Sequence, residues 1–257
     1  MRVKALSWNV NGLRAAHRNG NFLTLLEAES PDILGIQEIK AQVDQLPAEV
    51  TQVPGYHAYF NPAQRKGYSG VAVYSKTEPL EVTAGLGIEE FDAEGRVLIL
   101  RYPGFVLYNI YYPNGRMSDE RLAFKMRFYD AFLQHANAMR DAGNRLLICG
   151  DVNTAHREID LARPKENAQV SGFLAQEREW VDTFLSNGYL DTLRLFNQEA
   201  GQYSYWDMQS RARERNVGWR IDYFFVDEAL RPAVQDAFIL PQVMGSDHCP
   251  VGVVLEV

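Results

Sequence analysis

An aspartate and an asparagine follow a short apolar run in the middle of the chain. Leu146–Cys149 is uniformly apolar, as in a fully buried strand, and Asp151 and Asn153 come two positions apart just after Gly150. If the chain is still extended there, both side chains leave on the same face. Such a pair could take a proton from water and hold an anionic oxygen. The same residues also favour an ordinary turn, so this stretch alone leaves both interpretations open.

Polar side chains also mark the ends of other apolar stretches. Three more stretches end with them, at Asn9 and Asn11, at Glu38, and at Tyr111 and Asn114. Two stretches near the C-terminus instead begin with them, at Asp222 and at Asp247–His248. If these two strands run antiparallel to the others, all six polar ends meet at one edge. Six coincidences of this kind argue against random placement of turn residues.

The residue types at this edge suit hydrolysis of a phosphoester. Glu38 and Asn11 offer hard oxygen ligands that Mg²⁺ accepts, whereas no cysteine–histidine spacing suggests zinc. Asp222 and His248 could form a carboxylate–imidazole pair that favours the charged ring. A metal ion and an imidazolium neutralise developing negative charge, while Asp151 orients or deprotonates water. A lone acid is more often a surface turn and a lone histidine a core residue, but here each has polar neighbours.

Other signals for chemistry are missing. His17, His57, His135 and His156 have no comparable neighbours and are expected to be structural or exposed. The chain contains no Gly-x-x-x-x-Gly-Lys-Ser/Thr loop and no Gly-x-Ser-x-Gly motif, so neither a nucleotide cradle nor the usual hydrolase nucleophile is supported.

The elements that position these residues are predicted to be strands with helices between them. Strands are expected at Val3–Val10, Ile33–Ile36, Tyr56–Phe60, Gly70–Ser75, Glu81–Ala84, Arg96–Arg101, Phe105–Tyr112, Leu146–Cys149, Asp222–Val226, Val234–Leu240 and Val251–Val257. Helices are expected near Phe22–Leu26, from the N-cap Ser118 to Gly143, and from Trp180 to Gly188, with a polar loop over 160–172. Because no linker or strong repeat interrupts the chain, we expect one domain over residues 1–257, an α/β sandwich.

The composition is that of an ordinary globular protein. Hydrophobic residues make up 46% and charged residues 23%, and the net charge of −7 argues only mildly against a nucleic-acid partner, because binding responds to local patches. Local basic segments lie at 64–68 and 210–220. The two cysteines, Cys149 and Cys249, suggest a reducing compartment, and the N-terminus shows no signal-peptide pattern. We therefore expect a cytoplasmic protein without a membrane span.

Seven motifs together resemble the exonuclease III-type apurinic/apyrimidinic (AP) endonucleases of the endonuclease/exonuclease/phosphatase superfamily. They occur in family order from the first strand to the last, at 7–14, 36–40, 66–70, 109–114, 150–156, 216–223 and 246–250. Any one of them is weak, but the set is highly specific.

The resemblance implies a four-layer α/β sandwich, with two mixed β-sheets packed face to face and helices outside. It implies cleavage of duplex DNA 5′ to an abasic site by a monomer that uses Mg²⁺, with Mn²⁺ as a substitute. The implied metal ligands are Glu38, Asn11 and Asp247. The implied catalytic residues are Asp151, Asn153, Tyr111, Asn9 and His248 supported by Asp222. Whether Asp151 or a Tyr111 phenolate activates the nucleophile stays open, as does the number of metal ions.

Recognition is expected from loops. By resemblance, Tyr205, Trp219 and Ile221 form an apolar pocket for a sugar without a base, with Asn167 on a nearby loop, although core packing is the ordinary alternative. The implied DNA-backbone contacts are Arg14, Arg18, Gly67, Tyr68, Asn114 and Arg116, and Arg116 or Gln209 could insert into the duplex.

Two alternatives remain at this stage. The same fold serves other phosphoesterases, such as non-specific deoxyribonucleases and phosphatases, and a non-catalytic DNA-binding member is also conceivable. Exonuclease activity, 3′-end cleaning and incision at uracil or damaged bases occur among relatives and depend on loop geometry.

Overall fold

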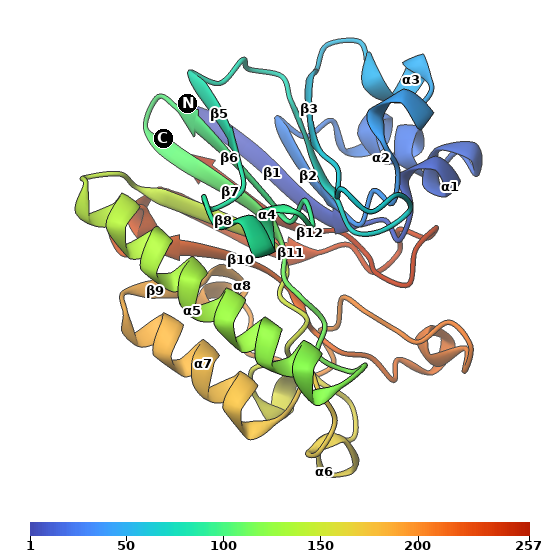
Figure 1. The fold of residues 1–257 in the computed structure, drawn as a ribbon, viewed down its shortest axis with the longest axis vertical. Helices are drawn as coiled ribbons and strands as arrows, with labels where there is room; N and C mark the ends of the chain where they lie inside the picture. The colour runs from blue at the N-terminus through green and yellow to red at the C-terminus, as the bar shows by residue number, and fades with distance from the viewer.

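Two mixed β-sheets form the centre of the computed structural model, which describes residues Met1–Val257 (Figure 1). In the first sheet the strand order is β11 (Val234–Ile239), β12 (Val251–Glu256), β1 (Arg2–Asn9), β2 (Ile33–Gln37), β4 (Val71–Ser75) and β3 (His57–Asn61). In the second the order is β5 (Glu81–Ala84), β6 (Val97–Tyr102), β7 (Phe105–Tyr111), β8 (Leu146–Asp151), β10 (Asp222–Asp227) and β9 (Tyr189–Asp191). This arrangement confirms the expected sandwich of two mixed sheets.

Strand direction brings the polar strand ends together. β1 runs parallel to β2, and β7 runs parallel to β8. β12 is antiparallel to β1, and β10 is antiparallel to β8, with Asp222 directly opposite Asp151. The residues that precede β10 and β12 therefore lie at the same edge as the residues that follow β1, β2, β7 and β8.

Apolar side chains fill the space between the sheets and cover their outer faces. The central cluster draws on both sheets, from Val3 in β1 to Leu255 in β12. A second cluster lies under α5 (Asp119–Asp141) and α7 (Ala175–Ser186), which run side by side along the second sheet (Figure 1). A third lies under α1 (Leu13–Arg18), α2 (Asn21–Glu29) and α3 (Ala48–Thr51) on the first sheet. Helices thus form the two outer layers.

A buried polar contact joins the two sheets just behind the site. Gln37, the last residue of β2, donates from Nε2 to Asn109 Oδ1 of β7 at 2.6 Å. Asn109 Nδ2 in turn donates to the carbonyl oxygens of Ile36 at 3.1 Å and Ala72 at 2.8 Å. Because breaking buried hydrogen bonds leaves polar groups without partners, these contacts favour the observed alignment of the two sheets. Glu38 follows Gln37, so the contact also places Glu38.

Local sequence signals set several boundaries. Ser118 caps α5 by accepting a hydrogen bond from the Arg121 amide at 3.1 Å, and Gly143 follows the helix with a positive φ of 89°, as expected. Gly150 has a φ of 141°, and a Cβ there would lie 1.8 Å from the Ile110 carbonyl oxygen. Only glycine therefore lets β8 approach β7 this closely one residue before Asp151.

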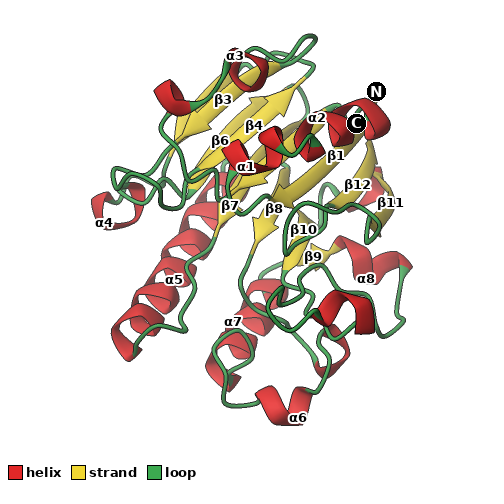
Figure 2. Cartoon of the chain, turned by 90° about the vertical axis from the view of Figure 1, so that its right-hand side faces the viewer, coloured by secondary structure: helices red, strands yellow, loops and turns green.

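Some elements differ from those expected. The structure adds α1, α3, α4 (Glu89–Asp92), α6 (Pro164–Asn167), β9 and α8 (Thr192–Phe196), and α6 lies within the stretch expected to be a polar loop. Most are of one or two turns, too short to show a clear 3.6-residue period. Figure 2 shows α6 at the far end of the loops below the sheets. The helices include none with both the length and the apolar character needed to cross a bilayer.

Candidate active site

Asp151 and Asn153 lie side by side, but in a turn. Asn153 has a left-handed φ of 57°, so the chain is no longer extended there. The Asn153 amide donates to Asp151 Oδ1 at 2.8 Å, and its Nδ2 donates to Asp151 Oδ2 at 3.2 Å. Of the two interpretations that the sequence left open, an extended chain and a turn, the structure shows the turn. The turn brings the two groups together instead, because the short aspartate side chain accepts from the backbone two residues later.

Asn9 connects the two sheets at this point. Its Nδ2 donates to Glu38 Oε1 at 2.9 Å and to Asp151 Oδ2 at 2.9 Å. Its Oδ1 accepts from the Asn11 amide at 3.0 Å. One fully buried amide side chain therefore fixes the separation of two carboxylates that are far apart in sequence.

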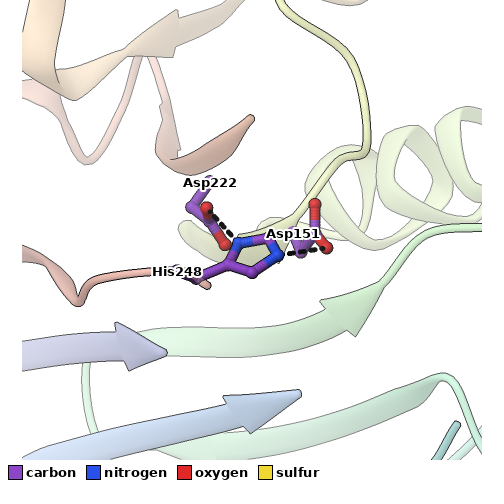
Figure 3. Close-up of side chains that lie close together, drawn as sticks. All are labelled: Asp151, Asp222 and His248. Atoms are coloured by element: carbon purple, nitrogen blue, oxygen red, sulfur yellow. Dashed lines mark hydrogen bonds and ion pairs between the residues drawn. The ribbon is translucent and has the colours of Figure 1, made fainter. Parts of the chain in front are cut away.

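A histidine lies between two aspartates, as Figure 3 shows. His248 Nδ1 is 2.8 Å from Asp222 Oδ2, and His248 Nε2 is 3.9 Å from Asp151 Oδ2. Asp222 Oδ2 also accepts from Ser204 Oγ at 2.6 Å. With a carboxylate on each side, the ring is held in place and its charged form is favoured.

Burial and these charges shift both titrations toward neutral pH or beyond. Burial alone would lower the pKa of His248, but Asp222 and then Asp151 outweigh it and raise the pKa to about 10. Burial, followed by the charge of Asp222, raises the pKa of Asp151 to about 7, although His248 opposes the rise. At neutral pH the site thus contains an imidazolium beside a carboxylate that can accept a proton.

Tyr111 is held as a neutral phenol. Burial and the charge of Glu38 raise its pKa well above the ordinary value, and Arg96 opposes this only in part. The Arg96 guanidinium lies 4.6 Å from the centre of the Tyr111 ring and donates to the Tyr111 carbonyl oxygen at 2.8 Å. These groups favour Asp151 over a Tyr111 phenolate as the proton acceptor.

The oxygen atoms around Glu38 suit a hard cation. Lys40 Nζ contacts Glu38 Oε2 at 2.6 Å and also donates to Asn11 Oδ1. These oxygen atoms therefore already contact one positively charged group. Asn11 Nδ2 donates to Asp247 Oδ1 at 3.1 Å. Carboxylate and amide oxygens of this kind are what Mg²⁺ accepts, usually together with water. The three residues expected as metal ligands therefore lie together.

A second group of possible ligands fits a metal less well. One ligand atom each from Asp151, Asp222 and His248 lies within 4.8 Å of the others. However, a protonated imidazole donates from both nitrogens and has no lone pair to offer. Because the pKa of His248 is raised to about 10, the oxygen set at Glu38, Asn11 and Asp247 fits a cation better.

An apolar cluster adjoins the site. Tyr205, Trp219 and Ile221 pack with Leu161 and Phe173, and the Tyr205 ring lies 4.9 Å from the His248 ring. Tyr205 and Trp219 are only partly buried, so they are not simply core residues. Asn167 does not join them by any hydrogen bond, since its Nδ2 donates to the carbonyl oxygen of Arg163 at 3.0 Å within its own turn.

The residues expected to contact the DNA backbone fall into three groups. Asn114 Nδ2 donates to Asn153 Oδ1 at 3.1 Å, and the Arg116 guanidinium lies 5.3 Å from the Trp219 ring, so both belong to the site itself. Arg14, Arg18 and Gly67 are exposed, as is Gln209. The Tyr68 hydroxyl accepts from Arg96 at 3.0 Å and from Arg121 at 2.8 Å, which holds Tyr68 beside the buried cation next to Tyr111.

Three residues that touch the site were not singled out from the sequence. Lys40 contacts Glu38, Ser204 supports Asp222, and the buried Lys125 donates to the Asn153 carbonyl oxygen at 2.8 Å. Lys40 stands only two positions after Glu38 and could have been noticed. Ser204 and Lys125 carry no local signal. His156 and His135 lie outside the site, paired with Asp182 and Tyr108.

Comparison with known proteins gives a consistent match. Residues 6–248 match the model of the endonuclease/exonuclease/phosphatase family. The exodeoxyribonuclease of Bacillus subtilis is 45% identical over 99% of this chain and 100% of its own length. The DNA-(apurinic or apyrimidinic site) endonuclease of Dictyostelium discoideum is 39% identical over 99% of this chain and 71% of its own. A 3′ phosphatase from Neisseria, solved with a product DNA hairpin, has a TM-score of 0.92 and 28% identity, covering 99% and 100% of the two chains.

Proposed function

This chain belongs to the endonuclease/exonuclease/phosphatase family, and from that premise we propose that it is a DNA repair nuclease that uses Mg²⁺ to hydrolyse the phosphodiester 5′ to an abasic site in duplex DNA. Two of the similar proteins carry names that support this choice, an exodeoxyribonuclease and an abasic-site endonuclease. The observation that carries the proposal is the junction at Asn9, where one amide joins Glu38 to Asp151 beside the His248–Asp222 pair.

The charge and position of each side chain suggest its role in the reaction. Asp151, with a pKa raised to about 7, accepts a proton from the attacking water at neutral pH. Asn9 and Asn153 donate to Asp151 Oδ2 and so hold the base in place, while their side-chain oxygens can accept a hydrogen bond from the attacking water. The His248 imidazolium and the neutral Tyr111 phenol donate hydrogen bonds to the phosphate oxygens as negative charge develops on them. Asp222 keeps His248 protonated and fixes the orientation of its ring.

Glu38, Asn11 and Asp247 would hold the cation. Bound Mg²⁺ supplies Lewis-acid stabilisation of the phosphate charge. Lys40 also contacts two of these residues, so its ammonium would compete with a dication for the same oxygen atoms. The remaining ligands would be water and phosphate oxygens.

The apolar cluster explains the choice of substrate. Tyr205, Trp219 and Ile221 offer a surface made mainly of two aromatic rings and an aliphatic side chain, which suits a sugar that has lost its base. Turning such a nucleotide out of the helix costs less, because there is no base to unstack. The exposed Arg14 and Arg18 on α1 would contact the DNA backbone.

The direct test is cleavage of a duplex that carries one tetrahydrofuran abasic analogue. We expect a single cut 5′ to the analogue in Mg²⁺, none in EDTA, and recovery of cleavage when Mg²⁺ or Mn²⁺ is restored. An undamaged duplex of the same sequence is the control. Uncut analogue DNA in Mg²⁺, together with release of phosphate from inositol phosphates, would instead indicate another phosphoesterase of the same fold.

Removal of 3′-terminal groups is a second activity that the same site could perform. The similarity to a Neisseria 3′ phosphatase favours it, because hydrolysis of a 3′ phosphomonoester also needs an activated water and groups that stabilise negative charge on phosphate oxygens. Duplexes ending in a 3′ phosphate or a 3′ hydroxyl would separate phosphatase from 3′–5′ exonuclease activity. Duplexes containing uracil or an oxidised base in the same panel would show whether a base-bearing nucleotide also enters.

A further inference from the structure

A lysine and a glutamate form a fully buried ion pair beneath the site. Lys125 lies in the first half of α5, and Glu177 lies in the first turn of α7. Lys125 Nζ is 2.6 Å from Glu177 Oε1, and both side chains are 0% exposed. Neither residue touches the surface, so neither can contact DNA. A buried pair of this kind is weak evidence for stability, since well-packed apolar residues often replace one without loss.

The lysine holds the backbone of the catalytic turn. Lys125 Nζ donates to the Asn153 carbonyl oxygen at 2.8 Å and to Thr154 Oγ1 at 2.8 Å, so all three of its donors are used. Asn153 adopts a left-handed conformation, which asparagine tolerates better than most residues, and hydrogen bonds to Asp151 and to Lys125 both hold the turn. The Lys125 ammonium is the charged group that contacts the backbone at Asn153.

The glutamate holds a second loop, the one that carries residues 168–174. Glu177 Oε1 accepts from Ser171 Oγ at 2.9 Å, and Oε2 accepts from the amides of Gly172 at 2.6 Å and Leu174 at 3.0 Å. The Ser171 carbonyl oxygen accepts from Arg116 Nε at 3.2 Å, beside the Trp219 ring. The pair therefore joins the turn that supplies Asn153 to the loop that borders the apolar pocket.

We propose that Lys125 and Glu177 are positioning residues that hold the Asn153 side chain at the reaction centre and tie it to the pocket loop. This inference rests on the proposed nuclease function. A displacement of about 1 Å in such a group can lower the rate roughly a hundredfold without affecting substrate binding to the same degree. The pair should therefore affect kcat more than KM.

The test uses a neutral replacement that keeps the pocket loop in place. In Lys125→Met/Glu177→Gln, the glutamine oxygen can accept from Gly172 and Leu174 while its amide donates to Ser171, so mainly the contacts to Asn153 and Thr154 are lost. The matched control is Asn137→Ala, farther along α5, which removes hydrogen bonds to Asn187 and Tyr189 but leaves the catalytic turn untouched. Lys125→Arg serves as the conservative variant.

Three measurements decide the outcome. On the tetrahydrofuran duplex we expect kcat of the double variant to fall about 10- to 100-fold, with KM within roughly threefold of wild type. Lys125→Arg should keep a kcat much closer to that of wild type than the double variant does. Amide hydrogen exchange over residues 151–156 should be faster than wild type in the double variant but not in Asn137→Ala. Comparing the melting temperatures of the two variants shows how much of any change in exchange comes from lower overall stability.

A folded double variant with wild-type kcat and wild-type exchange over 151–156 would overturn the inference. So would an equal loss of kcat in Asn137→Ala, because that would reduce the pair to a contributor to stability. If wild type itself fails to cut the analogue, the nuclease proposal fails, while hydrogen exchange still reports whether Lys125 holds the turn. If the double variant does not fold, Lys125→Gln, which removes the charge but keeps an amide donor, takes its place in the kinetic and hydrogen-exchange measurements under the same criteria.

Discussion

Replacing Asp151 by asparagine changes one atom at the centre of the site. Asp151 Oδ2 accepts from Asn9 Nδ2 at 2.9 Å and from Asn153 Nδ2 at 3.2 Å. Asparagine can keep the bond from the Asn153 amide through its oxygen, but its own amide group then faces two donors. The substitution therefore removes the proton acceptor and also disturbs the Asn9 contact that separates Asp151 from Glu38.

The size of the loss follows from these two effects. A positioned general base contributes about 10²- to 10⁴-fold to a rate. At about 1.4 kcal/mol per factor of ten, this corresponds to roughly 3–5 kcal/mol of transition-state stabilisation. Because the donor conflict at Asn9 adds to the lost base, we expect the upper half of this range. Binding should be kept or tightened, since a negative charge beside a phosphodiester is removed.

The wild-type pH profile provides the second half of this prediction. Since the pKa of Asp151 is raised to about 7 and the ionised form is the base, the wild-type rate should rise with pH and level off above about 7. Asp151→Asn should lack this acid limb. Single-turnover cleavage of the tetrahydrofuran duplex from pH 5.5 to 9 measures the limb, and gel-shift binding in EDTA measures affinity.

Asp227→Asn is the matched control for this substitution. Asp227 is also a buried carboxylate, 1% exposed, but it accepts from the Leu146 amide at the opposite end of β8. It should retain wild-type cleavage and the wild-type pH profile. Cleavage by Asp151→Asn within tenfold of wild type, or an unchanged acid limb in that variant, would refute the assignment of Asp151 as the base.

Three further predictions concern the surroundings of the base. Asp222→Asn should lower the free energy of unfolding at pH 6 by about 3–5 kcal/mol. Because the pKa of His248 is raised from 6.5 to about 10, the stabilisation from the charged His248 is complete below pH 6.5 and is lost as the pH rises through 10. Urea unfolding curves of wild type and Asp222→Asn should therefore converge at high pH. Arg14→Ala or Arg18→Ala should weaken duplex binding equally for all sequences and reduce its salt dependence, and a sequence-selective loss would contradict this. Tyr205→Ala should lower kcat/KM for the abasic analogue by roughly tenfold or more, since it removes the ring beside His248, whereas Tyr205→Phe should stay within roughly threefold.

Short-range patterns in the sequence were enough for most of the fold. Apolar runs such as Leu146–Cys149 are local signals, and the structure places a strand at each stretch where one was expected. Cap residues such as Ser118 and Gly143 set the bounds of the longest helix for the same reason. The short helices α1, α6 and α8 were missed, because elements this short depend on what they pack against more than on their own propensity.

The polar residues at the strand ends predicted the members of the candidate site but not the contacts between them. The sequence placed Asn9, Glu38, Asp151 and His248 at strand ends, and alternation and direction of strands brought them to one edge. It could not show that Asn9 joins Glu38 to Asp151, that Lys40 contacts the cation ligands, or that Asn153 stands in a left-handed turn.

The residues that could do chemistry, and the end of the sheets at which they lie, were predictable from the amino-acid sequence, because strand periodicity and turn preference act over a few neighbouring positions. Only the tertiary structure decided their protonation and support. Asn9 meets Asp151 across 142 positions, and Lys125 meets Glu177 across 52. The pKa values of Asp151 and His248 depend on burial and on charges brought together from both sheets, and a Coulomb interaction depends on distance in space, not on separation along the chain.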